Sequence, residues 1–282
     1  MYFKTLIMYC YYEENESKDN LEFFIKNGIY NNLQYQYVII INNEKCSVNI
    51  PEYSNIKIIK RSENNTDLFT YKLILKLLDN NYLSFFDRFY FINSSCIGPF
   101  MSNISNISWI DSMNLLLCDY DLIGPVVEIP NDNHGFKVLN INSNKNIPFI
   151  HTYFFGLNKF GFQILQKIFD EIEVDNKLFI IHNTERKITS SILINNGKIR
   201  SFLTRFKNVD LNDPKNWKSS LWNKDNISCY EVPNNYDGID LNPYEVIFFK
   251  NIRNVNESRE EKSANIDATI FKFINKYKEW MY

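Results

Sequence analysis

The chain has 282 residues, of which 45% are hydrophobic and 23% charged, so its composition excludes a disordered chain and allows one large or two small globular domains. The net charge is −2 and no basic block stands out, which argues against nucleic acid as the main ligand. The five cysteines are scattered, without a CxxC pair or a Cys/His cluster. This argues against a structural zinc site and a disulfide framework, and it favours a reducing compartment.

The first half of the chain alternates predicted strands and helices. The apolar residues at the N-terminus are too few for a signal peptide or a membrane span, so we expect a first strand there and no transmembrane segment. The expected strands are 6–11, 37–41, 56–59 and 89–92, and the expected helices are 18–27, ended by Gly28, and 68–78, with Thr66 or Asp67 as the N-cap. This order predicts an α/β fold, a mostly parallel sheet with helices on its faces.

The run 89–92 is wholly apolar and suits a strand buried on both faces in the middle of such a sheet. It stops at Asn93-Ser94-Ser95, and Gly98-Pro99 then turns the chain. Ligand crevices in open α/β sheets lie beyond the carboxyl ends of the strands, so this polar triplet is a candidate site. The alternative is that these residues only cap a strand and begin a turn.

The second half of the chain is more varied. We expect a helix over 109–118, a strand over 121–127 that Gly124-Pro125 breaks, an exposed loop over 131–146, an apolar stretch over 149–157, helices over 160–172 and from Thr184-Glu185 to 194, and a strand over 198–203. The region after 206 is less regular. An amphipathic helix over 257–282 is expected to pack on the domain. Attachment of this helix to a membrane surface is a minor alternative, because its polar side is mixed in charge.

Seven segments, in order, resemble a known family. They are 23–28 followed by 37–42, Asn65 with Asp67, 90–100, 122–125, 151–157, Glu185 with 190–193, and 242–250. Together they resemble the GT-A-type glycosyltransferases of the rhamnan-synthesis group, which include glycosyltransferases of large DNA viruses. The resemblance covers roughly residues 3–253, and the order of the segments makes it specific.

The resemblance implies a GT-A-like domain over 1–253, followed by a C-terminal helical extension over 254–282. It implies an inverting glycosyltransferase that moves a sugar, possibly a deoxyhexose such as rhamnose, from a UDP- or other nucleotide-sugar donor. The implied acceptor is a glycan or glycoprotein. The expected location is cytoplasmic, in the host cytoplasm for a viral protein.

The resemblance also assigns roles to individual residues. Glu185 is the candidate catalytic base, by similarity to the Glu-Asp motif of inverting GT-A enzymes at the start of a helix. Arg186 stands where that motif has its second acid. A carboxylate at a helix start is also favoured by the helix dipole alone, which is the structural alternative. His151 is expected to line the acceptor side or to form hydrogen bonds within the fold.

The donor side is assigned to residues around the polar triplet. Most GT-A enzymes hold a divalent cation, Mn²⁺ or Mg²⁺, with an Asp-x-Asp motif, where this chain has Asn93-Ser94-Ser95; Asn93 and Ser95 are weak ligands for such an ion. Three alternatives remain: weak metal binding, compensation by a nearby side chain, or a metal-independent site. Lys250 and Arg253 are candidates to neutralise the diphosphate of the donor. Asn65 and Asp67 are candidates to contact the base or the ribose. Tyr11 and Tyr12 could stack on the base, and the alternative is that both are aromatic residues of the core.

Two rival functions remain. A nucleotidyltransferase that forms nucleotide-sugars normally carries a Gly-rich phosphate loop after its first strand, and residues 11–15 contain no glycine. A non-catalytic nucleotide- or glycan-binding relative of a glycosyltransferase is the stronger rival, because the acidic metal motif is absent.

Overall fold

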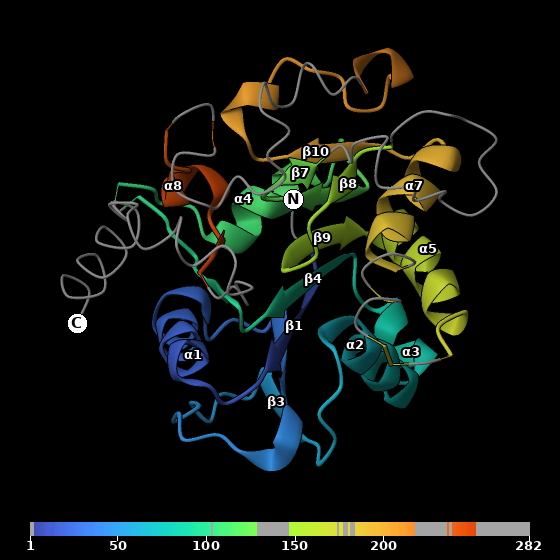
Figure 1. Ribbon diagram of the computed structural model, residues 1–282. Helices are drawn as coiled ribbons and strands as arrows, with labels where there is room; N and C mark the ends of the chain where they lie inside the picture. The colour runs from blue at the N-terminus through green and yellow to red at the C-terminus, as the bar shows by residue number, and fades with distance from the viewer. Residues whose placement is uncertain are drawn as a thin grey trace, which may run out of the picture.

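The computed structural model describes residues 3–102, 104–128, 147–173, 175–176, 180, 184–217, 236 and 239–251. The expected loop 131–146, the C-terminal helix, Arg253, His134 and His182 lie outside these residues. A seven-stranded sheet forms the centre of the described part, and helices lie on both of its faces (Figure 1).

The central sheet is mostly parallel, which confirms the predicted α/β class. Its strand order is β10-β6-β9-β4-β1-β2-β3. The strands are β1 (Thr5–Tyr11), β2 (Tyr35–Ile41), β3 (Ile56–Lys60), β4 (Arg88–Asn93), β6 (Leu122–Gly124), β9 (Phe154–Asn158) and β10 (Ile199–Ser201). The pairs β4–β1, β1–β2, β2–β3 and β6–β10 are parallel, whereas β9 runs antiparallel between β4 and β6. The strand β4 is the middle strand, as its apolar run predicts.

Two apolar clusters lie on the two faces of the sheet and divide the residues of β1 between them. Leu6, Met8 and Cys10 pack in the cluster that α2 and α5 cover, and Ile7, Tyr9 and Tyr11 pack in the cluster of α1 and α4. Side chains alternate along a strand, so a strand covered on both faces must be apolar at every position. This double burial explains why the central strands lack the alternation of an exposed sheet.

The helices follow the predicted pattern with shifted ends. They are α1 (Asn15–Gly28), α2 (Asp67–Leu77), α3 (Asn80–Ser84), α4 (Trp109–Leu116), α5 (Lys159–Asp170), α7 (Arg186–Ile194) and α8 (Pro243–Val246). The short helix α3 was not predicted. Among the described residues, a 3₁₀ turn follows β2 at Asn42–Glu44, and two more follow β10 at Thr204–Phe206 and Pro214–Asn216.

Two of the expected apolar stretches each divide into two strands. Gly124-Pro125 ends β6, and β7 (Val127–Glu128) then leaves the main sheet to pair with β8 (Phe149–Ile150). A turn at 151–153 separates β8 from β9. Proline has no N–H to donate to a ladder, which accounts for the first break. The pair β7–β8 and the pair β5 (Cys96–Ile97) with β11 (Phe249–Lys250) form two small sheets beside the main one.

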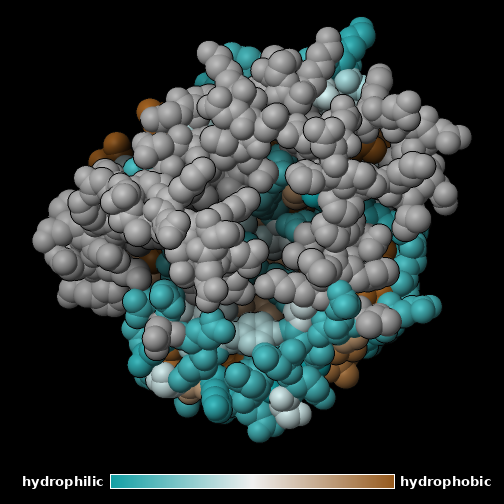
Figure 2. Space-filling view, in the orientation of Figure 1, coloured by the Kyte–Doolittle hydropathy of each residue, from teal (hydrophilic) through white to brown (hydrophobic). Residues whose placement is uncertain are grey.

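The described surface is largely hydrophilic in the lower half of Figure 2, where β3 lies in Figure 1, and hydrophobic residues form separate spots there. Within the described residues, no helix is long and apolar enough to cross a membrane.

Candidate functional site

The carboxyl ends of four parallel strands meet at one edge of the sheet. The strands β3, β2, β1 and β4 lie side by side and run in the same direction, so Arg61, Asn42, Tyr12 and Asn93 come together where these strands end. The first residues of α2 lie at the same edge. The sequence places a candidate site here, and the structure supplies its geometry.

Asn93 connects the polar triplet to the start of α2. Its Nδ2 donates to Asp67 Oδ2 at 2.5 Å, and its Oδ1 accepts from the Ser95 backbone N–H at 3.1 Å and from Ser95 Oγ at 2.6 Å. Burial raises the pKa of Asp67. The hydrogen bond from Asn93 lowers it, the charge of Glu185 raises it and that of Lys250 lowers it. The Asn93 N–H donates to the Tyr153 carbonyl at 3.0 Å, and Tyr153 and its neighbour Thr152 contact Lys250 and Glu185, so these residues lie in one region of the fold.

Glu185 immediately precedes α7, and Thr152 holds its carboxylate. The Thr152 backbone N–H and Oγ1 donate to Glu185 Oε1 at 2.8 and 2.9 Å. The Glu185 side chain makes no capping bond to its own helix. Thr189 of α7 accepts from the Ile150 backbone N–H at 2.9 Å, which fixes the helix on β8. Thr152 therefore fixes this carboxylate across the fold, in addition to the favourable position that the start of a helix gives it.

His151 lies beside this arrangement and pairs with another acid. Its Nε2 is 3.2 Å from Glu128 Oε2, and its ring is stacked on Phe149 with centroids 5.3 Å apart. The guanidinium of Arg186 lies 5.1 Å from the centroid of the Phe149 ring. These contacts match the expectation that His151 forms bonds within the fold. They do not test its role on the acceptor side.

Lys250 reaches the site through the small β5–β11 sheet. It pairs with Cys96 in the ladder, and its Nζ lies 5.8 Å from the centroid of the Tyr153 ring. Gly98 permits this approach: a Cβ at Gly98 would lie 2.6 Å from the carbonyl oxygen of Ile247. A side chain at position 98 would push the strand of Lys250 away from the polar triplet.

Two asparagines hold the polar triplet from behind. Asn20 of α1 and Asn251 exchange amide hydrogen bonds of 2.8 and 2.9 Å. Asn20 also donates to the Ser94 carbonyl at 2.9 Å, and the Asn251 N–H donates to the Ser95 carbonyl at 3.1 Å. Sequence reasoning missed Asn20, Asn251 and Thr152, since partners 231 positions apart give no local signal.

The two tyrosines after β1 differ. Tyr11 is fully buried in the core, and its hydroxyl donates to Glu13 at 3.1 Å. Because a buried ring does not stack on a ligand base, Tyr11 follows the alternative expectation of an aromatic residue in the core. Tyr12 is half-buried, and its backbone N–H donates to Ser94 Oγ at 3.3 Å. Of these two tyrosines, Tyr12 is the one that is partly exposed.

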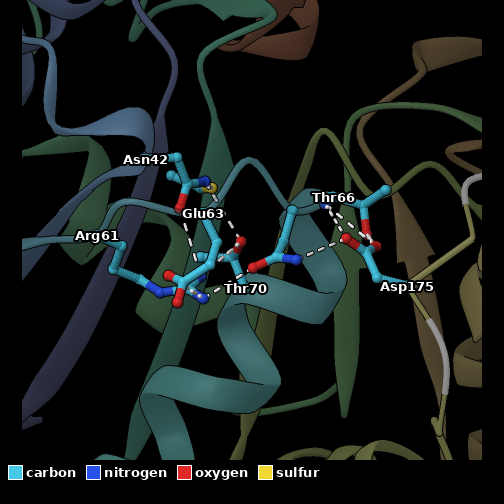
Figure 3. A network of polar contacts seen from close by, with 8 residues as sticks. Asn42, Arg61, Glu63, Thr66, Thr70 and Asp175 are labelled. Carbon is cyan, nitrogen blue, oxygen red and sulfur yellow. Dashed lines mark hydrogen bonds and ion pairs between the residues drawn. The ribbon is translucent and has the colours of Figure 1, made fainter.

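The polar network around Arg61, Thr66 and Asp175 (Figure 3) also binds the side chain of Asn65. Asn65 Oδ1 accepts from Arg61 at 2.8 Å, and its Nδ2 donates to Asp175 at 2.9 Å. Asp175 also accepts from the Thr66 backbone N–H at 3.2 Å and from its Oγ1 at 2.6 Å. The amide predicted to contact the donor is thus bound within the protein, where it helps to fix the first turn of α2.

Arg61 is the centre of the same network. Its side chain is only 10% exposed, and its Nη1 donates to Asn42 Oδ1 at 3.4 Å and to Thr70 Oγ1 at 3.3 Å. Glu63 pairs with its Nη2 at 3.2 Å. The network ties the ends of β2 and β3 to α2, so the edge of the sheet is held in shape without a ligand.

The arrangement of Asn93 and Ser95 does not fit a divalent cation. The amide oxygen of Asn93 already accepts two hydrogen bonds, and its nitrogen faces the one carboxylate beside it, that of Asp67. Among the described residues, no group of three or more His, Cys, Asp or Glu side chains is spaced to hold a metal ion. Hard cations need several oxygen ligands, so a cation here would depend on the Asp67 carboxylate and the phosphates of a donor rather than on Asn93 and Ser95.

The fold and the site define a class: an α/β protein with a polar site at the carboxyl edge of a mostly parallel sheet. No protein-family model matches the chain, and no curated protein matches it. Among solved structures it is similar to a mannosyltransferase, PcManGT from Pyrobaculum calidifontis in complex with GDP-Man and Mn²⁺. The TM-score is 0.43 with 8% sequence identity, over 71% of this chain and 55% of that one. The chain thus spans little more than half the length of that protein.

Proposed function

We propose that the chain is a glycosyltransferase that moves a sugar from a nucleotide-sugar donor to an acceptor hydroxyl. One observation carries the proposal: a carboxylate held by Thr152, a lysine and the Asp67–Asn93 pair share the carboxyl edge of the sheet. The ordered sequence segments that resemble the rhamnan-synthesis group support the same reading. An acid–base group beside a cation is what transfer from a diphosphate requires.

In this proposal Glu185 takes the proton of the acceptor hydroxyl. Its Oε1 accepts two hydrogen bonds from Thr152, and among the described residues no hydrogen bond occupies Oε2. The bound oxygen fixes the carboxylate, and the other oxygen accepts the proton as the hydroxyl attacks the anomeric carbon. A single displacement of this kind inverts the configuration at that carbon, which becomes oxocarbenium-like in the transition state.

Lys250 is proposed to stabilise the leaving group. The bond from the anomeric carbon to the diphosphate breaks, and the electron pair stays on a phosphate oxygen. A compact ammonium charge beside the polar triplet stabilises that oxygen. Asp67, Asn93 and Ser95 are proposed to hold the donor, while Arg253 and a divalent cation remain proposals from the resemblance alone.

The finer assignments also rest on the resemblance. They are UDP as the nucleotide, a deoxyhexose such as rhamnose as the sugar, a glycan or glycoprotein as acceptor, residues 1–253 as the catalytic domain, and a cytoplasmic location. The donor set around Asn93 favours an alternative function, a non-catalytic nucleotide- or glycan-binding relative, because the acidic metal motif is replaced.

The first experiment is a thermal-shift panel of nucleoside diphosphates and nucleotide-sugars, with Mn²⁺ and with EDTA. A ligand that binds only the native state raises the melting temperature. We expect one family of diphosphates to stabilise the protein in both conditions, and Lys250→Gln to reduce that shift. If no nucleotide shifts the transition in either condition, the donor site is wrongly assigned.

Glu185→Gln then separates the enzyme from the binding module. With a donor from the panel, hydrolysis or transfer that releases the nucleoside diphosphate should fall by about 10²–10⁴-fold, while donor binding persists. Glu52→Gln, at an exposed position before the amino end of β3, makes the same change at the opposite edge of the sheet and should leave turnover as it was. Turnover that survives Glu185→Gln contradicts the role of this base. Donor binding without turnover in the unaltered protein favours the binding relative.

A further inference from the structure

A cavity lies on one face of the sheet, between α2, α3 and α5. Figure 1 shows these three helices side by side. The cavity has a volume of about 790 Å³, within the usual range for small-molecule sites. The strand residue in its lining is Phe89, at the amino-terminal end of β4, and none of the residues of the candidate functional site lines it. The cavity is therefore a separate site at the other end of the strands.

Four lysines from two helices line this cavity. Lys72 and Lys76 come from α2, and Lys159 and Lys167 from α5; two aspartates, Asp79 and Asp170, face them. The chain as a whole has a net charge of −2, so an excess of positive charge in one cavity is a local feature. A concave site with this excess attracts anions.

Contacts within the protein neutralise only part of the positive charge of these four lysines. Lys159 donates to the Ser84 carbonyl at 3.0 Å, and Lys76 lies 3.9 Å from Asp170 in an exposed pair. Lys72 is 9% exposed and donates to the Ile172 carbonyl, which carries no formal charge. Burial lowers the pKa of Lys72, and the charge of Lys76 lowers it further. Lys167 has no ionic partner among the described residues.

The apolar residues of the cavity are covered by their own packing. Phe89 and Phe162 stack with centroids 3.6 Å apart, and Leu75, Leu83, Phe89 and Phe162 are each at most 6% exposed. The accessible wall therefore combines ammonium groups, the two carboxylates and the amides of Asn80, Gln163 and Gln166 with a similar share of carbon atoms. Such a wall suits a compact phosphorylated molecule, because its anionic oxygens pair with lysine and its hydroxyl groups with the amides.

We propose that this cavity binds a phosphorylated small molecule of sugar-phosphate size, with the phosphate held by the lysines of α2 and α5 and the hydroxyl groups held by the amides. Lysine is a usual ligand for phosphate, as a compact charge. The proposal does not depend on the proposed transferase activity.

The test is calorimetric titration of the full chain in a buffer free of phosphate. The probes are glucose 6-phosphate, glucose and octanoate. The test variant is Lys76→Gln with Lys167→Gln, two lysines of the cavity wall that are not part of the proposed donor site. A matched control, Lys57→Gln with Lys60→Gln, removes the same charge from exposed positions on β3. A second control, Lys250→Gln, reports on the candidate donor site.

We expect glucose 6-phosphate to bind and glucose and octanoate not to bind. The test variant should weaken binding of glucose 6-phosphate about ten-fold, and both controls should leave it unchanged. Added salt should weaken binding in the unaltered protein. If the double variant does not fold, Lys167→Gln alone makes the same test with about half the loss in binding free energy.

Three results overturn the proposal. They are no binding of glucose 6-phosphate to the unaltered protein, binding that the cavity variants do not weaken, and binding that Lys250→Gln weakens instead. Tighter binding of octanoate than of glucose 6-phosphate overturns the ligand class. The transferase proposal fails on a different result, the absence of any nucleotide effect, so the two failures are distinguishable.

Discussion

At the residue scale, two buried tyrosines, Tyr9 of β1 and Tyr71 of α2, differ in whether the hydroxyl group has a hydrogen-bond partner. Tyr9 is 1% exposed and its ring stacks on Phe24, but its hydroxyl has no hydrogen-bond partner among the described residues. The hydroxyl of Tyr71 donates to the Ile92 carbonyl at 2.6 Å. A buried polar group without a partner costs free energy, whereas one with a partner contributes.

Tyr9→Phe should therefore raise the free energy of unfolding by about 1 kcal/mol, and Tyr71→Phe should lower it by about 1 kcal/mol. Urea denaturation of both variants beside the unaltered protein measures the difference. The two substitutions delete the same atom from equally buried rings, so each is the control for the other. Equal effects of the two variants would contradict the assignment of their partners.

Whether a residue of the candidate site could be predicted from the sequence depends on how far away in the chain its partners lie. Asn93, Ser95 and Glu185 are at the ends of predicted elements, where a local pattern already marks a candidate site, and Lys250 was indicated by the resemblance alone. The groups that hold them could not be predicted, because Thr152 meets Glu185 across 33 positions and Asn20 meets the triplet across 74. Tyr11 shows a related limit of sequence analysis, because a pattern does not distinguish an aromatic residue of the core from one that stacks on a ligand.

At the scale of elements, the first turn of α2 is held by a residue of another segment. The N-cap residue Thr66 makes no side-chain capping bond to its own helix. Asp175 instead accepts from the Thr66 backbone N–H and hydroxyl and from the Asn65 amide (Figure 3). A carboxylate is favoured at a helix N-terminus, where it also satisfies an orphan donor.

Asp175→Ala should lower the free energy of unfolding by about 1–2 kcal/mol, since three donors lose their acceptor. Asp170→Ala is the control: this exposed aspartate makes only a 3.9 Å surface pair and should cost about 0–0.5 kcal/mol. Urea denaturation compares the two. A loss no larger in Asp175→Ala than in Asp170→Ala would show that the α2 terminus does not depend on this bond.

The elements themselves were predictable where burial and chain order act together. The strands β1 to β4 and the helices α1 and α2 follow from apolar runs and helical spacing. The direction of β9 did not follow, since an apolar stretch carries no mark of the strand it will pair with. The division of 121–127 was marked by Gly124-Pro125, but the pairing of β7 with β8 depends on contacts between distant parts of the chain.

At the scale of the whole molecule, tyrosine is a large part of the core on both faces of the sheet. Tyr9, Tyr37, Tyr71 and Tyr90 are each at most 1% exposed. Burial raises the pKa of all four above the usual range, because the phenolate form loses its hydration. The folded protein therefore keeps protons that the unfolded chain releases at alkaline pH.

The protein should consequently lose stability as the pH rises above about 10, the ordinary pKa of tyrosine in an unfolded chain. The sign follows from linkage: groups with a raised pKa in the folded state bind more protons there, so the free energy of unfolding falls with pH, by up to about 1.4 kcal/mol per pH unit for each tyrosine. Burial also raises the pKa of the Cys10 and Cys96 thiols, so a smaller loss of stability should begin near about pH 8.5.

Urea midpoints measured across this range, with phenolate absorbance in parallel, test the prediction. Buried tyrosines should ionise only as the protein unfolds, and Tyr90→Phe should reduce the alkaline slope by up to one tyrosine's share. Full phenolate absorbance near pH 10 in a protein that remains folded would contradict the buried placement of these rings.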